Sequence, residues 1–399
     1  MKSETNGTPA HRLLTLTLFT MIYFDYNATS PLKPGVLEAM LPYYRDFYGN
    51  PSSLHRSGRI TRDAVEKARE QVAALTGASP SQIVFSSGGT ESNNLAIRGL
   101  ADRFPAGRIL VSPIDHPSVL EPVKALSRNG WSVTPLRVND QGVICEQSIE
   151  AAIQADVRFA SCMIVNNETG VIQDIASITE KLRDRNIPIH CDAVQALGKI
   201  ALDFNALGIA FMSVSAHKVG GPKGVGALVI DKSIQIEPLL RGGAQEHGLR
   251  GGTENVAAIA GFGAAAEIAR RDLEKNAQHL IVLKQQIEQG LKKLPSVTIF
   301  SEYAKRVPNT LMFGIHGMDG EMMVMELDRK GIAVSSGAAC SSQSSEASHV
   351  LLAMGIPEDF ARSAVRVSLG PENTAAEVDL FLSVAYRILA GAAVKAAAY

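Results

Sequence analysis

The chain has 399 residues, of which 46% are hydrophobic and 20% are charged. A chain of this length and composition can bury a substantial core and is expected to divide into two domains. Its 39 Lys and Arg residues nearly balance its 40 Asp and Glu residues, so the net charge of −1 provides no general attraction to nucleic acid or to an anionic membrane. The four cysteines lack CxxC spacing, which argues against a disulfide framework and a zinc site and favours reduced thiols in the cytoplasm.

Residues 1–20 are interpreted as an extension that is either disordered or precedes the true start of the protein at Met21. The apolar stretch at 13–19 is too short to span a bilayer, and no small-x-small cleavage site follows it. We therefore expect neither a signal peptide nor a membrane span here. No other segment of the sequence is a candidate for a transmembrane helix.

Helical patterns at about 34–48 and 58–76 precede a region in which short apolar runs alternate with further helical patterns. The apolar runs are 83–85, 108–111, 159–165, 187–191, 211–214 and 225–230. This repetition of strand and helix predicts an α/β protein with a largely parallel sheet that is covered on both faces. Ligands of such sheets bind at the carboxyl ends of the strands.

A long Ala- and Lys-rich helical stretch from Asn255 to about Leu294 is expected to lead the chain into a second domain. The apolar runs 308–313, 332–334 and 366–369, a helix near 320–330 and a closing helix predict a smaller α+β unit. We expect a large domain of residues 34–270. Residues 21–33 and 271–399 would form the small domain, which carries a cysteine loop at 335–348.

Polar residues follow the ends of the first predicted strands. The segment 86–93 contains Gly88-Gly89-Thr90, a glycine turn that opens a helix whose N–H groups, with the Thr90 hydroxyl, can hold a phosphate. A helix N-cap without a ligand explains these residues equally well. His116 and Asn167 follow the next two strands, and each taken alone is also explained as an ordinary loop residue.

The next two strands are followed by residues with a more specific chemistry. Asp192 follows the run 187–191, and Lys218 follows the run 211–214. Alone, Asp192 could be a helix N-cap and Lys218 a solvated loop residue. Together with the Gly-Thr turn they predict pyridoxal phosphate, because a lysine forms the imine, an acid keeps the ring nitrogen protonated and a helix N-terminus neutralises the phosphate.

Cys340 lies in a serine-rich segment, 335–345, that is too polar for a helix face or a buried strand. Free cysteine is usually buried as a small hydrophobic residue, so an exposed cysteine on such a loop indicates a nucleophile. An incidental surface cysteine is the alternative interpretation.

The residues described above belong to motifs by which the chain resembles the cysteine desulfurases of the NifS/IscS family from about Tyr23 to Tyr386. The motifs that carry the resemblance are 25–29 (DYNAT), 49–55 (GNPSSLH), 89–94 (GTESNN), 115–117 (DHP), 166–170 (NNETG), 192–195 (DAVQ), 215–218 (SAHK), 250–255 (RGGTEN) and 335–340 (SSGAAC). These enzymes are class V aminotransferase-like, fold-type I pyridoxal-phosphate proteins. The resemblance implies a mostly parallel seven-stranded sheet, and the long segment after Cys340 is similar to the family's first group.

The resemblance also implies roles for residues around the cofactor ring. Lys218 would bind the cofactor covalently, and Asp192 would pair with the pyridine nitrogen. His116 would stack on the ring and assist proton transfer, while Gln195 and Asn167 would lie near the phenolic oxygen.

Further roles concern the phosphate, the substrate and the sulfur. The residues that match phosphate contacts are Gly89, Thr90, Ser215 and His217, with Thr253 reaching the phosphate from the other subunit of a homodimer. Arg366, helped by Asn167, would bind the substrate carboxylate, a role that suits a guanidinium. Cys340 would attack the substrate sulfur. No metal is expected.

The implied reaction converts L-cysteine to L-alanine and leaves a persulfide on Cys340, for iron–sulfur cluster assembly or other thio-cofactor synthesis in the cytoplasm. The partner would be a sulfur-acceptor or iron–sulfur scaffold protein. The chain ends at Tyr399 without the longer extension through which housekeeping members dock their scaffold, so the acceptor stays open. Three alternatives remain: a selenocysteine lyase, an aminotransferase, and a cofactor-bound interaction subunit of an iron–sulfur assembly complex.

Overall fold

A seven-stranded sheet forms the centre of the protein, whose structure is a computed structural model that describes residues 21–337 and 346–396. The strand order is β2-β8-β7-β6-β5-β3-β4. In chain order the strands are β2 (Ile83–Ser86), β3 (Arg108–Val111), β4 (Ser132–Pro135), β5 (Val157–Ser161), β6 (Ile189–Asp192), β7 (Phe211–Ser215) and β8 (Gly226–Ile230).

The sheet is mostly parallel, as the sequence predicts. Only β8 runs antiparallel to its neighbours β2 and β7. The connection from β7 to β8, residues 216–225, is too short for the crossover that a parallel pair needs, so the chain turns back directly. The edge strand β4 was not predicted, because Val133 is its only apolar residue apart from the terminal proline.

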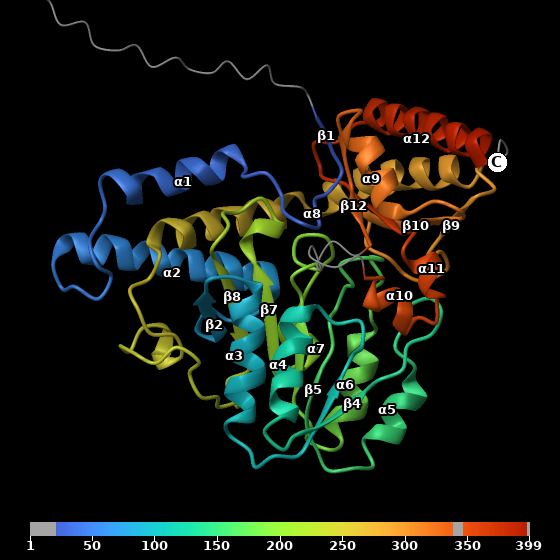
Figure 1. Ribbon diagram of the computed structural model, residues 1–399. Coiled ribbons are helices and arrows are strands. Elements are labelled where there is room, and N and C mark those ends of the chain that lie inside the picture. Colours follow the sequence, from blue (N-terminus) through green and yellow to red (C-terminus); the bar gives the residue numbers. More distant parts are fainter. Residues whose placement is uncertain (1–20, 338–345, 397–399) are drawn as a thin grey trace, which may run out of the picture.

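Helices cover both faces of this sheet (Figure 1). Alternate strand residues belong to different cores: Phe85 and Met212 pack on one face, and Val84 and Phe211 pack on the other. The first core includes side chains of α1 (Pro34–Arg45), α2 (Arg56–Thr76) and α6 (Ile175–Arg183). The second includes side chains of α3 (Gly89–Ala101) and α4 (Pro117–Ser127). The shorter helices of this part are α5 (Glu146–Ala152), α7 (Phe204–Leu207), η1 (Pro80–Gln82), η2 (Ala216–Lys218) and η3 (Glu246–Gly248).

A second, antiparallel sheet has its own core. Its strand order is β12-β13-β10-β9, and a separate parallel pair joins β1 to β11. The strands are β1 (Ile22–Tyr23), β9 (Val297–Ile299), β10 (Thr310–Ile315), β11 (Ile332–Ala333), β12 (Ser335–Ser336) and β13 (Val365–Ser368). The helices are α9 (Gly320–Asp328), α10 (His349–Ala353), α11 (Glu358–Ala361) and α12 (Ala375–Ala396).

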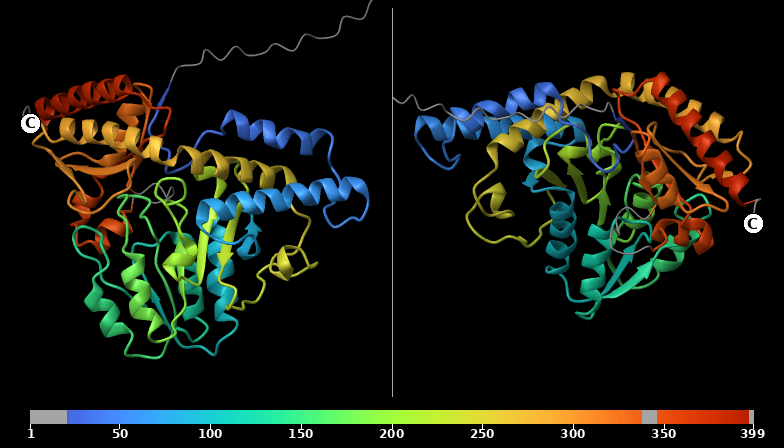
Figure 2. Two further views of the ribbon diagram at one scale, coloured as in Figure 1. Left: turned by 180° about the vertical axis from the view of Figure 1, so that it is seen from behind. Right: turned by 45° about the horizontal axis from the view of Figure 1, so that its top comes forward.

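Helix α8 (Val256–Leu291) connects the two parts, running from beside α1 and α2 to beside α12 (Figure 2). Its first half packs into the core of the large sheet through Phe262 and Ala266, and its second half packs into the core of the small sheet through Leu283 and Ile287. We keep the domain boundary at residue 270 as a proposal. Over the described residues, no helix is long and apolar enough to cross a membrane.

Candidate active site

A cavity lies at the carboxyl edge of the central sheet, beside the ends of β6 and β7. It encloses about 930 Å³, its open mouth included, which is a usual size for a small-molecule site. The predicted residues that line it are Gly89, Thr90, His116, Asn167, Asp192, Gln195, Ser215, His217, Lys218 and Arg366. Thr253 is exposed and does not line this cavity, and Cys340 lies outside the described residues.

Asp192 is the last residue of β6, and its side chain is buried. Its Oδ1 accepts a hydrogen bond of 2.9 Å from the Val194 backbone N–H, and its Oδ2 accepts one of 2.8 Å from Asn93 Nδ2. None of the ion pairs within the described part of the chain includes Asp192. Both of these donors are neutral, so the buried carboxylate can accommodate a cationic ligand group.

Lys218 ends the short helix η2, directly after β7. Its Nζ donates hydrogen bonds to the backbone oxygens of Asn27, at 2.5 Å, and Ala28, at 2.9 Å. These two residues precede α1 in sequence and bring the N-terminal segment into the wall of the cavity. Lys218 therefore reaches the same space as Asp192, because their consecutive strands β6 and β7 are parallel neighbours in the sheet.

The glycine turn before α3 provides room and donors for an anion. A Cβ atom on Gly89 would lie 2.7 Å from Val194 Cγ2, so a larger residue here would displace the Val194 side chain. The first N–H groups of a helix are unpaired within it and point outwards, which favours a phosphate. Ser215 Oγ is buried in the same cavity and has no hydrogen-bond partner among the described residues. Burial, with Lys218 and Lys223, lowers the pKa of His217 to about 4, so its ring is neutral.

Arg366 reaches the cavity from β13 of the small sheet. Its Nη2 lies 2.8 Å from Asp25 Oδ1, and its Nη1 donates to the backbone oxygen of Asn167 at 3.1 Å. Its Nε is buried and has no partner within the described residues. The guanidinium is thus held in place while its Nε–H remains for a ligand.

His116 is the N-cap of α4. Its Nδ1 lies 2.7 Å from Ser118 Oγ and accepts a hydrogen bond of 3.1 Å from the Ser118 backbone N–H. Burial, together with Lys218 and His349, lowers its pKa, whereas Asp192 acts in the opposite direction. His116 is therefore a neutral imidazole at the wall of the cavity.

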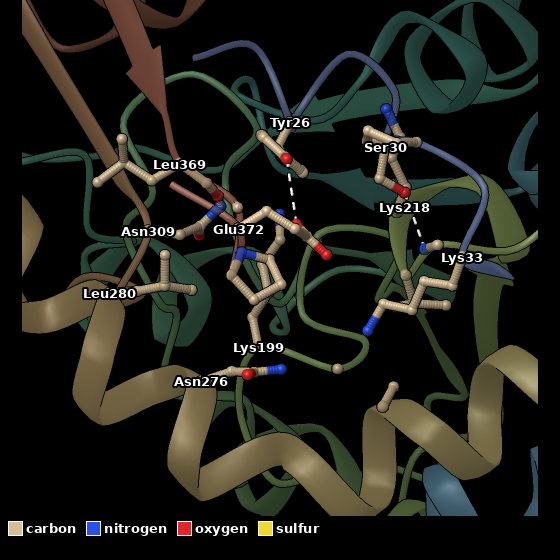
Figure 3. A pocket seen from close by; sticks show the side chains of 17 residues that line it. Tyr26, Ser30, Lys33, Lys199, Lys218, Asn276, Leu280, Asn309, Leu369 and Glu372 are labelled. Carbon is tan, nitrogen blue, oxygen red and sulfur yellow. Dashed lines mark hydrogen bonds between the residues drawn. The ribbon is translucent and has the colours of Figure 1, made fainter. Parts of the chain in front are cut away.

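A second cavity shares Lys218 with the first and is shown in Figure 3. In it, Lys199 Nζ donates to Asn27 Oδ1 at 2.8 Å and to Gln195 Oε1 at 2.5 Å. Gln195 Nε2 in turn donates to the Asn27 backbone oxygen at 3.0 Å. Burial lowers the pKa of Lys199 well below its ordinary value, and Lys218 and Arg366 add to this. These contacts fix the orientation of the Gln195 amide, with Oε1 toward Lys199 and Nε2 toward the Asn27 backbone oxygen.

Three polar lining residues were not predicted as site residues: Asn27, Asn93 and Ser118. Asn93 follows Thr90 by three positions on α3, a spacing that places both on one helix face and that could have revealed it. Ser118 is adjacent to the motif at 115–117 but carried no signal of its own. Asn27 belongs to the motif at 25–29, whose approach to the sheet depends on contacts far apart in sequence.

Comparisons with known proteins agree with this arrangement. Residues 22–381 match the family Aminotransferase class-V. The cysteine desulfurase IscS of Dictyoglomus turgidum is 41% identical over 371 residues, which are 92% of this chain and 94% of that protein. A solved NifS-like protein has a TM-score of 0.88 at 39% identity, covering 93% of this chain and 99% of its own. The structure titled SspA in complex with cysteine has a TM-score of 0.78 at 35% identity, covering 88% of this chain and 100% of its own.

A mostly parallel sheet with a lysine, an acid and an anion-binding turn at its carboxyl edge defines a fold-type I pyridoxal-phosphate enzyme. The matches narrow this class further. The chain belongs to the aminotransferase class-V family and, within it, to the cysteine desulfurases of the NifS/IscS type.

The residues present fit pyridoxal phosphate, the cofactor of this family. The buried atoms without hydrogen-bond partners in the described part of the cavity are Asn93 Oδ1, Ser215 Oγ and Arg366 Nε, as expected where a polar ligand supplies the missing partners. When bound, the cofactor supplies an electron sink for the substrate Cα. Lys218 would link to it and Asp192 would pair with its ring nitrogen.

Proposed function

We propose that the protein takes sulfur from L-cysteine, releases L-alanine and leaves the sulfur on Cys340 as a persulfide. The observation that carries this proposal is the convergence of Lys218, Asp192 and Arg366 on one cavity. The similarity to SspA, a protein described in complex with cysteine, supports cysteine as the substrate.

Arg366 would bind the substrate carboxylate through its Nε–H, with Asn167 beside it, and so orient the amino acid. Lys218 would remove the α-proton and return a proton to the product carbon. His116 would assist proton transfer near the substrate sulfur. Gln195 and Asn167 would lie near the phenolic oxygen, and the phosphate contacts would be Gly89, Thr90, Ser215 and His217.

The Cys340 thiolate would attack the substrate Sγ. The Cβ–Sγ bond of the substrate breaks, an S–S bond forms, and Cβ receives a proton. L-cysteine and one thiol thus become L-alanine and one persulfide, with no external oxidant or reductant. The buried thiols are poor alternatives, since burial raises the pKa of Cys162 and of Cys191 well above the ordinary value.

Mass spectrometry of the holoenzyme after exposure to L-cysteine tests this function. We expect a gain of one sulfur atom on the peptide that contains Cys340, with alanine as the product. A keto-acid requirement without persulfide would indicate an aminotransferase. Turnover of selenocysteine with negligible turnover of cysteine would indicate a selenocysteine lyase. No turnover of either amino acid would favour the remaining alternative, an interaction subunit of an iron–sulfur assembly complex.

We also propose a cytoplasmic homodimer in which Thr253 reaches the phosphate of the partner subunit. Thr253 is exposed in the single chain, as this role requires. The product sulfur would pass to an acceptor or iron–sulfur scaffold protein, for iron–sulfur cluster assembly or other thio-cofactor synthesis. Light scattering tests the dimer, and a fully active monomeric holoenzyme would contradict it.

A further inference from the structure

Asn93 connects Asp192 to Ser118 in the wall of the cavity. Its Nδ2 lies 2.8 Å from Asp192 Oδ2 and 2.8 Å from Ser118 Oγ. An ionised carboxylate only accepts hydrogen bonds, so the amide nitrogen and not Oδ1 must face Asp192. Both hydrogens of the amide are then used, one toward Asp192 and one toward Ser118. The orientation of the Asn93 amide is therefore determined by its two neighbours.

The hydrogen-bond donors around Ser118 also determine the protonation of His116 Nδ1. Ser118 Oγ accepts the hydrogen bond from Asn93, and its own hydroxyl has one proton to donate. Of its neighbours, His116 Nδ1 lies 2.7 Å away and can accept that proton. The Ser118 backbone N–H donates to the same Nδ1 at 3.1 Å. Two donors thus converge on Nδ1, which must carry a lone pair and no hydrogen.

We propose that Ser118, oriented by Asn93, holds the neutral ring of His116 as its Nε2–H tautomer. The ring then offers a proton to a ligand in the cavity and not a lone pair. Asn93 and Ser118 are positioning residues, because they act through His116. The meaning of this tautomer for catalysis rests on the proposed function, whereas the tautomer itself does not.

In the proposed reaction, the neutral ring of His116 would act as a hydrogen-bond donor through its Nε2–H, and it could not accept a proton at Nε2. The charged and titratable groups that influence the ring are Asp192 from β6, Lys218 from η2 and His349 from α10. Asp192 favours the cationic ring, and the other two oppose it. The hydrogen bonds to Nδ1 favour the neutral ring, because a protonated Nδ1 could not accept them.

Nitrogen NMR of the full-length holoenzyme labelled with ¹⁵N-histidine tests the tautomer directly. The chain has nine histidines, and the signals of His116 are assigned by their loss in His116→Asn. We expect a protonated Nε2 and an unprotonated Nδ1 in the neutral ring of the wild type. A protonated Nδ1 there would overturn the proposal.

Substitutions at Ser118 distinguish the effect of its hydroxyl on the His116 tautomer from other effects of changing this side chain. Ser118→Ala removes one of the two donors to Nδ1, so the ratio of Nδ1–H to Nε2–H should rise about fivefold, the effect of one typical hydrogen bond. The midpoint of the His116 titration should also rise. Ser118→Thr retains the hydroxyl and should retain the wild-type signals. Ser127→Ala changes an exposed serine at the other end of α4 and is the matched control.

Asn93→Ala should shift the tautomer ratio in the same direction as Ser118→Ala, because the Ser118 hydroxyl loses the donor that orients it. If Asn93 only supported Asp192, this variant would weaken cofactor binding and leave the His116 signals unchanged. Equal spectra for Ser118→Ala and Ser118→Thr would also overturn the proposal. Alanine production from L-cysteine is measured on the same samples, so failure of the proposed function is seen separately from failure of the tautomer assignment.

Discussion

Arg366 donates a 3.1 Å hydrogen bond from Nη1 to the backbone oxygen of Asn167, although the two residues belong to different parts of the fold. Arg366 lies in β13 of the small sheet, and Asn167 follows β5 of the large sheet. Asp25 Oδ1 holds the neighbouring Nη2 at 2.8 Å. The guanidinium is therefore fixed between the two parts of the protein, with its Nε left for a ligand.

Arg366→Lys should weaken substrate binding, because an ammonium cannot contact Asp25, Asn167 and a substrate carboxylate in the same directions. We expect KM for L-cysteine to rise by roughly tenfold or more, the usual effect of losing a charge-assisted hydrogen bond. The visible absorbance of the bound cofactor should persist. Steady-state kinetics provide the measurement, and an unchanged KM would show that another residue binds the carboxylate.

Lys218→Ala should prevent covalent attachment of the cofactor, since Lys218 is the amine proposed to bind it. Borohydride reduction followed by peptide mass spectrometry should find the cofactor on Lys218 in the wild type and on no peptide of the variant. Lys223→Ala changes a nearby exposed lysine and is the matched control. A cofactor that is still reducible onto the protein in Lys218→Ala would refute the assignment.

Asp192→Ala should leave a cofactor that binds but is a poor electron sink, because its ring nitrogen loses its carboxylate partner. Alanine production should fall by orders of magnitude. Asp174→Ala, which removes an exposed N-cap carboxylate from α6, should change it little. Turnover by Asp192→Ala at the wild-type rate would remove this residue from the mechanism.

His190 should make folding stability depend on pH. It is buried between Ser161 Oγ, 2.9 Å from Nδ1, and Ser213 Oγ, 3.0 Å from Nε2, and burial lowers its pKa from 6.5 to about 4. The contribution of neutral His190 to the free energy of unfolding is therefore fully present above about pH 6.5. It is lost as the pH falls toward about 4, by roughly 3 kcal/mol in total.

Denaturant unfolding of the wild type and of His190→Gln across this pH range measures the His190 contribution as the difference between the two profiles. Direct NMR titration of His190 in the folded wild type supplies a second measurement if the variant is too unstable. Stability profiles of the two proteins that run parallel over this pH range, or a measured pKa of His190 near 6.5 in the folded protein, would contradict this prediction.

Cys340→Ser should bind L-cysteine but form no persulfide and release no sulfide, because serine lacks a nucleophile of comparable strength at neutral pH. Cysteine binding is followed by the change in cofactor absorbance, and the persulfide by mass spectrometry. Serine at Cys145, Cys162 or Cys191 should leave persulfide formation largely intact. Undiminished alanine production by Cys340→Ser, or an adduct on one of the other three cysteines, would remove Cys340 from the mechanism.

Much of the fold followed from local patterns. The run 211–214 became β7, and the stretch from Asn255 became α8, because apolar runs and helical periodicity are properties of adjacent residues. Asp192 and Lys218 were predicted to lie close together because parallel strands end at one edge of a sheet. The direction of β8 was not predicted, although the short connection before it excludes a crossover.

The sequence by itself determined the elements and the reactive groups at their ends, because both depend on residues that are neighbours along the chain. Only the tertiary structure decided the partners: Asp25 for Arg366, Asn27 for Lys218 and Asn93 for Asp192. The first two pairs are separated by 341 and 191 residues and the third by 99. Such partners are selected when two sheets and the N-terminal segment pack together, and buried polar groups must then find donors or acceptors wherever the packing places them.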